Sequence, residues 1–242
     1  GRTREALDIN QGLARTAPLV PWIQAAQIDL LIANHRLDEA QDAAAHAGRM
    51  WPRDRLIWFS RFFLDAFNGR PDSALAMVAN RAEWPLQTSP EEIALAGRFA
   101  HAMASRSRAD ADQVLAAYGK LAPRGQGYAE AAIRIASALD RPDEAMSFAR
   151  GLYLQSVPRG PRGVLIPRIG YVYPQERGTT ALFTPPADAM WASPAFLNLA
   201  SDIGLVDYWR STVAPDFCHE TASAKLCEAW KIPISRGARD SV

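Results

Sequence analysis

The sequence lacks several features that would assign it to common functional classes. None of its apolar runs approaches the roughly 20 residues that a membrane-spanning helix needs. Neither sign of charge prevails, because 27 basic residues stand against 26 acidic ones. A net charge of +1 creates no long-range field that would attract nucleic acid or an anionic membrane surface. We therefore expect neither membrane insertion nor direct nucleic-acid binding by this chain.

Catalytic and cofactor motifs are also missing. The sequence contains no Gly-x-Ser-x-Gly, no His-Glu-x-x-His, and no phosphate-loop or dinucleotide pattern. The pair Glu91 and Glu92 fits a helix start, where carboxylates favour the helix dipole. Glycines in the 159–163 segment could form an anion-binding loop together with Arg168, but Pro161 removes a donor and favours an ordinary basic turn. We expect no enzymatic activity and no cofactor.

Histidine and cysteine are scarce, with four and two residues. Only His219 has neighbours of the metal-ligand type, Cys218 and Cys227, and their spacing lacks the close pairs of zinc sites. Three alternatives remain for the cysteines: a disulfide, a metal site or two free thiols. One unbroken helix would place their Cα atoms roughly 13 Å apart, against the ~5.5 Å of a disulfide. A bond therefore requires the chain to double back over residues 219–223.

What the sequence does contain is an internal repeat. The phrases at 36–40, 70–74 and 141–145 are variants of Arg-x-Asp-x-Ala, and 108–111 is a degenerate copy. The alanine markers are Ala6, Ala40, Ala74, Ala111 and Ala145, spaced 34, 34, 37 and 34 residues apart. A second series of markers follows each of them: Pro18, Pro52, Pro85, Pro123 and Pro158. This period of 34 residues is that of tetratricopeptide repeats.

The markers have mechanical reasons in such a helix-turn-helix unit. An alanine early in the second helix lets two antiparallel backbones approach closely, and the following proline ends that helix. Pro71 and Pro142 fall at a first helical turn, where the missing N–H costs nothing. Ser89 and Glu92 form a predicted capping box. The repeat around 92–123 carries about three extra residues.

The chain thus resembles a tetratricopeptide-repeat domain, which implies an all-α, right-handed superhelix of antiparallel helix pairs with a C-terminal helical cap. We assign residues 1–158 to the array, 159–186 to a Pro/Gly-rich extended segment packed on it, and 187–242 to the cap. The array begins with the second helix of a unit, so we expect an upstream segment. The cap should bury five side chains: Phe196, Leu199, Leu205, Tyr208 and Trp209.

Three motifs near the C-terminus carry a second resemblance: Pro-x-Phe at 194–196, Gly-Leu-x-Asp-Tyr-Trp-Arg at 204–210 and Pro-Asp-Phe-Cys at 215–218. They resemble the end of the C-terminal repeat region of bacterial membrane-anchored winged-helix transcriptional regulators and related adenylate cyclases. This resemblance implies an upstream effector domain and repeats that face the periplasm. It favours a Cys218–Cys227 disulfide, which persists in that compartment. The alternative is two free thiols in a cytoplasmic protein.

The repeat register also predicts a binding surface. An aromatic set with helical spacing, Trp58 to Phe67, favours core packing between helices. The positions that line the concave groove of such an array are Asp29, Phe59, Phe63, Glu130 and Arg134. A groove with aromatic and charged ends suits a protein partner, a peptide or a small amphipathic ligand, although the apolar segment 164–173 could occupy it instead. We predict a non-catalytic, ligand- or protein-binding sensory domain of a bacterial signalling protein, or alternatively a free-standing tetratricopeptide adaptor.

Overall fold

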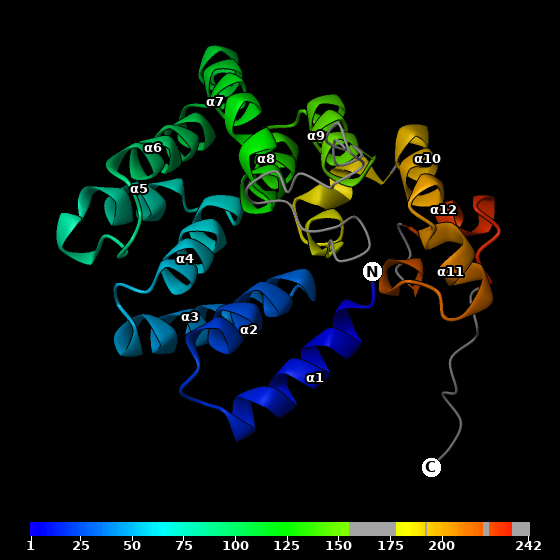
Figure 1. Cartoon of the computed structure of the whole chain (residues 1–242), viewed down its shortest axis with the longest axis horizontal. Coiled ribbons are helices and arrows are strands. Elements are labelled where there is room, and N and C mark those ends of the chain that lie inside the picture. Colours follow the sequence, from blue (N-terminus) through cyan, green and yellow to red (C-terminus); the bar gives the residue numbers. More distant parts are fainter. Residues whose placement is uncertain (155–177, 192, 220–222, 234–242) are drawn as a thin grey trace, which may run out of the picture.

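The chain folds into helices joined by short turns (Figure 1). The computed structural model describes residues 1–154, 178–191, 193–219 and 223–233, and no strand occurs within these ranges. The helices before residue 155 are α1 (Thr3–Thr16), α2 (Pro21–Ala33), α3 (Leu37–Met50), α4 (Arg55–Phe67), α5 (Pro71–Ala79), η1 (Arg81–Glu83), α6 (Pro90–Ser105), α7 (Arg108–Leu121), η2 (Ala122–Arg124), α8 (Gln126–Ala138) and α9 (Pro142–Leu154).

Capping and turn chemistry sets the helix boundaries. Pro71 and Pro142 are the first residues of α5 and α9, as predicted. Gly69 lies between α4 and α5 with φ of 74°, a left-handed conformation that glycine adopts without strain. The predicted capping box is present: the Ser89 hydroxyl accepts a bond from the Glu92 N–H at 3.2 Å, and the Glu92 carboxylate accepts one from the Ser89 N–H at 3.0 Å.

The three extra residues of one repeat lengthen a single helix. Helix α6 has 16 residues, whereas α2, α4 and α8 have 13 each. The insertion therefore lies inside α6 and leaves the neighbouring turns at their repeat positions.

Helices adjacent in sequence pack against each other from α1 to α9, and α2 also packs against α4. The marker residues Ala40, Ala74 and Ala145 have no exposed surface, and Ala111 is 6% exposed. Ala6 is half-buried. Small side chains thus stand where the helices approach closely, and the predicted all-helical architecture of neighbouring helix pairs is confirmed.

The C-terminal part continues the same core. Its elements are η4 (Thr180–Leu182), η5 (Ala187–Met190), α10 (Pro194–Asp202), α11 (Leu205–Ser211), η6 (Asp216–His219) and α12 (Ala224–Ala229). Helices η4 and η5 pack on α8, and η5 and α10 also pack on α9. One buried apolar cluster runs from Trp58 in α4 to Ile232, and a second, smaller one joins α1 to α4.

Two of the five predicted cap residues are less buried than expected. Phe196, Leu199 and Trp209 are at most 1% exposed, but Leu205 is half-buried and Tyr208 is 42% exposed. The prediction for Tyr208 was wrong because the seven-residue α11 has a narrow apolar face. Val206 and Trp209, three residues apart, fill that face. The Tyr208 hydroxyl instead accepts a bond from the Arg2 guanidinium at 3.0 Å.

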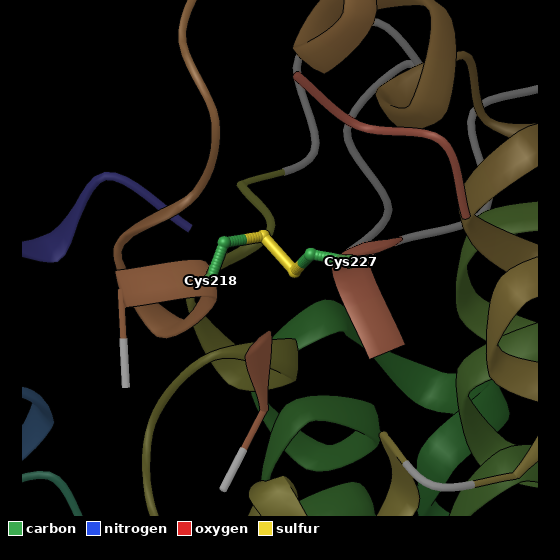
Figure 2. The surroundings of a disulfide bond; sticks show 2 residues. All are labelled: Cys218 and Cys227. Carbon is green, nitrogen blue, oxygen red and sulfur yellow. A yellow bond between two sulfur atoms is a disulfide. The ribbon is translucent and has the colours of Figure 1, made fainter. Parts of the chain in front are cut away.

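Cys218 and Cys227 form a disulfide with a Cα–Cα distance of 5.6 Å (Figure 2). Cys218 lies in η6 and Cys227 in α12, so the two sulfurs do not belong to one continuous helix. The last helix was predicted to begin near Glu220; α12 begins at Ala224. The bond uses both sulfurs that the zinc alternative would require.

The C-terminal cap contacts the first helix (Figure 1). One carboxylate oxygen of Asp216 accepts bonds from the Thr3 hydroxyl at 3.1 Å and from the Arg4 N–H at 2.9 Å. The Asp216 N–H donates to the Gly1 carbonyl at 2.8 Å. Asp216 therefore satisfies backbone donors in the first turn of α1 from a position more than 200 residues away in sequence.

Several predicted features lie outside the described residues. These are most of the extended segment assigned to 159–186, its basic turn with Arg168, and the apolar stretch 164–173. Of the helices that the structure describes, none has the length and apolar character needed to cross a membrane.

Candidate functional site

A cavity of about 580 Å³ is lined by side chains from α2, α4, α6, α7, α8 and η4. Its volume lies within the range of small-molecule sites, about 300–1,000 Å³. The five residues that the repeat register predicted all line it: Asp29, Phe59, Phe63, Glu130 and Arg134. The register therefore placed residues from three separate helices on one concave surface.

Helical spacing explains why these side chains converge. Phe59 and Phe63 are four residues apart in α4, and Glu130 and Arg134 are four residues apart in α8, so each pair shares one helix face. Asp29 comes from α2, which packs against α4. The cavity thus lies where the first helices of successive predicted repeats present equivalent faces.

The aromatic set of α4 divides between core and cavity. Trp58 and Phe62 are at most 1% exposed and stack with ring centroids 5.4 Å apart, as the core-packing interpretation predicted. Phe59 and Phe63 are half-buried, line the cavity and lie 6.1 Å apart. Residues on the opposite face of the same helix therefore supply an apolar wall to the site.

Arg134 is held in a fixed orientation at this wall. Its guanidinium lies over the rings of Phe63 and Phe67, at 5.2 and 4.9 Å from their centroids. Its Nε and Nη2 atoms are shielded from solvent and have no hydrogen-bond partner. The Oδ1 atom of Asp29 is likewise shielded and unpaired. A buried polar atom left without a partner costs about 1–3 kcal/mol, so these atoms favour a bound polar group.

The charges of this inner group influence one another. Burial raises the pKa of Asp29, and both the Arg134 charge and the Ser60 hydroxyl oppose that rise. Burial also raises the pKa of Glu130, against a hydrogen bond from Gln126 at 2.7 Å and the Arg134 charge. Burial lowers the pKa of Arg134, and the two carboxylates oppose it. The protein environment therefore solvates these three charges incompletely.

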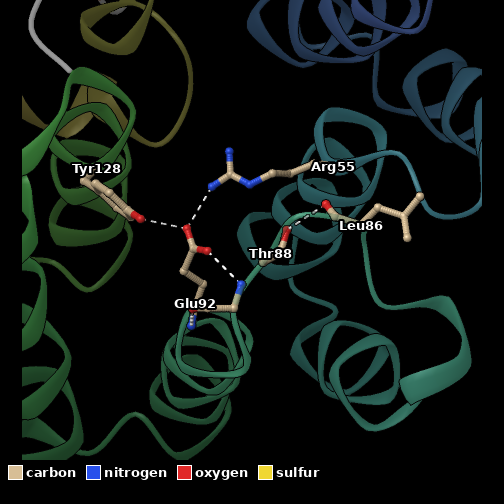
Figure 3. A network of polar contacts seen from close by, with 6 residues as sticks. Arg55, Leu86, Thr88, Glu92 and Tyr128 are labelled. Carbon is tan, nitrogen blue, oxygen red and sulfur yellow. Dashed lines mark hydrogen bonds and ion pairs between the residues drawn. The ribbon is translucent and has the colours of Figure 1, made fainter. Parts of the chain in front are cut away.

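A second polar cluster joins three helices at the cavity (Figure 3). One oxygen of Glu92 in α6 accepts bonds from the Tyr128 hydroxyl of α8 at 2.8 Å and from Arg55 of α4 at 2.9 Å. The other oxygen accepts the capping bond from Ser89. Sequence reasoning had identified only the capping role of Glu92 and had missed Arg55 and Tyr128. No local signal marks this cluster, because its members lie more than 35 residues apart.

Replacing Glu92 by glutamine should weaken this cluster in a pH-dependent way. Burial would raise the pKa of Glu92, but bonds from Ser89, Tyr128 and Arg55 outweigh it and lower that pKa. An acid with a lowered pKa in the folded state adds stability above its unfolded pKa of about 4.3, and this stability is lost as the pH falls through the folded value. Glu92→Gln should therefore reduce the free energy of unfolding by about 1 kcal/mol at neutral pH.

Urea unfolding of the Glu92→Gln variant and the wild type, from neutral pH to pH 3, checks this prediction. The difference between them should narrow below about pH 4. The neighbouring Glu91 is exposed, and Glu91→Gln is the matched control that should change little. A difference for Glu92→Gln that is independent of pH would contradict the electrostatic account.

The cavity offers binding groups, and its lining includes neither histidine nor cysteine. Within the described ranges, no three metal-ligating side chains of the His, Cys, Asp or Glu type gather at one point. Comparisons with protein families, with characterised proteins and with solved structures gave no match to this chain.

Proposed function

We propose that this chain is a non-catalytic binding domain with a tetratricopeptide-like architecture, in which antiparallel helix pairs form a right-handed superhelix and the cavity is the ligand site. The observation that carries the proposal is the convergence of the five register-predicted residues on one cavity of about 580 Å³. The buried marker alanines and the contact between α2 and α4 support the repeat interpretation.

We further propose that the domain is the sensory part of a bacterial signalling or transcription-regulatory protein, with its effector domain upstream and the repeats in the periplasm. The support is the C-terminal resemblance through residues 194–218, together with the disulfide, which would persist in an oxidising compartment. Thiol titration of the protein, extracted unreduced from its native cells and then unfolded, tests this location: two free thiols would contradict it.

Thermal unfolding in the presence of a library of metabolites tests the binding function. Compounds that bind the folded domain raise its melting temperature, since a ligand at 100 times its dissociation constant adds about 2.7 kcal/mol. Ala131 of α8 is half-buried and lines the cavity. Ala131→Phe should fill the cavity and abolish the shifts.

Ala76→Phe is the size-matched control, because Ala76 lies on the exposed face of α5. It should retain every shift that the wild type shows. If no compound shifts the wild type, or if Ala131→Phe responds as the wild type does, the cavity is not the binding site. A free-standing adaptor would be favoured by the first of these outcomes, because its ligand is another protein.

A further inference from the structure

We infer that the cavity binds a small zwitterion, a ligand that carries a carboxylate and an ammonium group on an apolar frame. This inference rests on the proposed binding function and specifies its ligand class. α-Amino acids and short peptides share this chemistry.

The carboxylate end is assigned by Arg134. Its unpaired Nε and Nη2 atoms are the two donors of one edge of the guanidinium. The same edge of Arg36 binds a carboxylate elsewhere in this protein, where Nε and Nη2 donate to the two oxygens of Glu39 at 2.7 and 2.6 Å. Such a fork matches a carboxylate in a bidentate manner. Phe63 and Phe67 fix the plane of the Arg134 guanidinium, so the free edge is preorganised.

The ammonium end is assigned by Asp29 and Glu130. These two carboxylates accompany one guanidinium in the inner group, which leaves an excess of negative charge when both are ionised. Asp29 Oδ1 has no partner and is shielded from solvent. The other cavity charges do not compensate, because Arg55 is bonded to Glu92. A ligand ammonium would supply both the positive charge and the missing donor.

Simpler ligands would leave part of this site unmatched. A monocarboxylate would satisfy Arg134 and leave the Asp29 oxygen unpaired, and an amine would do the reverse. A phosphate would be repelled by Asp29 and Glu130. The wall formed by Phe59, Phe63 and Leu95 would receive the apolar part of the ligand. Only a ligand with both charges matches all the unpaired groups.

Isothermal titration calorimetry with the standard α-amino acids and the dipeptides Gly-Leu, Leu-Gly, Gly-Phe and Phe-Gly tests the inference. The best binder is then compared with two analogues, one lacking its amino group and the other lacking its carboxylate. We expect each analogue to bind at least tenfold more weakly. The free amino acids and the dipeptides differ in the separation of their charges, so the better class identifies the source of the zwitterion.

Variants assign each charge to its partner. Asp29→Asn should reduce the preference for the zwitterion over the deaminated analogue by tenfold or more. Arg134→Lys, which keeps the charge and loses the fork, should do the same for the decarboxylated analogue. Asp207→Asn, at a side chain 89% exposed, is the control and should leave all affinities unchanged. If Arg134→Lys does not fold, Asp29→Asn alone still tests the ammonium assignment.

The outcomes separate the ligand class from the binding function. If library compounds other than zwitterions stabilise the wild type but not Ala131→Phe, the cavity is a binding site and the zwitterion inference is wrong. Equal affinity for a zwitterion and either of its analogues would also overturn the inference. If no compound gives binding sensitive to Ala131→Phe, the proposed function itself fails.

Discussion

Replacing Trp209 by alanine is expected to reduce the free energy of unfolding by about 3–5 kcal/mol, the range for a fully buried aromatic side chain. Trp209 is 1% exposed. Its ring lies 5.9 Å from those of Phe183 and Phe217 and 6.4 Å from that of Trp230. The side chain thus joins α11 to three other parts of the cap, and its removal leaves a cavity among aromatic rings.

Urea unfolding followed by circular dichroism measures this effect, and Tyr208→Ala is the matched control. Tyr208 precedes Trp209 in the same short helix and is also aromatic, but it is 42% exposed. Its replacement should cost less than about 1 kcal/mol. Because one apolar cluster runs from α4 into the cap, Trp209→Ala should destabilise the whole chain in one transition. Equal effects of the two substitutions would show that the cap does not stabilise the array.

Replacing Ala74 by leucine is expected to destabilise the domain by about 1–3 kcal/mol through overpacking. Ala74 has no exposed surface and belongs to α5, which packs against both α4 and α6. The backbones of α5 and α6 are close: a Cβ atom added at Gly97 would lie 3.1 Å from a Val78 methyl group. A larger side chain at position 74 must therefore displace a neighbouring helix.

Ala76→Leu, two residues further along α5 on its exposed face, is the control and should lie within about 0.5 kcal/mol of the wild type. The difference between the two midpoints of chemical denaturation isolates the packing effect from helix propensity, because both substitutions are the same. If Ala74→Leu is as stable as Ala76→Leu, alanine at the repeat marker has no packing role.

Much of the candidate site could be predicted from the sequence because a repeat fixes equivalent positions. Once the 34-residue period is known, the residue that faces the groove in one unit indicates its counterpart in the next. Phe59 and Phe63 in α4, and Glu130 and Arg134 in α8, were found in this way and do line one cavity. The prediction needed only helical spacing, which is a local property.

The rest of the site could not be predicted, because it depends on how far apart the helices lie. The bond between Tyr128 and Glu92 joins residues 36 apart. Thr180 and Thr184 reach the cavity from beyond α9. Whether such side chains meet is decided by small rotations accumulated over several helices, and no pattern within one helix encodes them.

The sequence by itself determined the helical architecture, the positions of its caps and turns, and the face of each first helix that lines the cavity. All of these follow from interactions between residues a few positions apart. Only the tertiary structure decided that Tyr208 is exposed, that Asp216 binds the first turn of α1, and that Arg134 keeps one donor edge unpaired. These features arise where distant segments pack together, and there the shape of the whole chain determines which polar groups find partners.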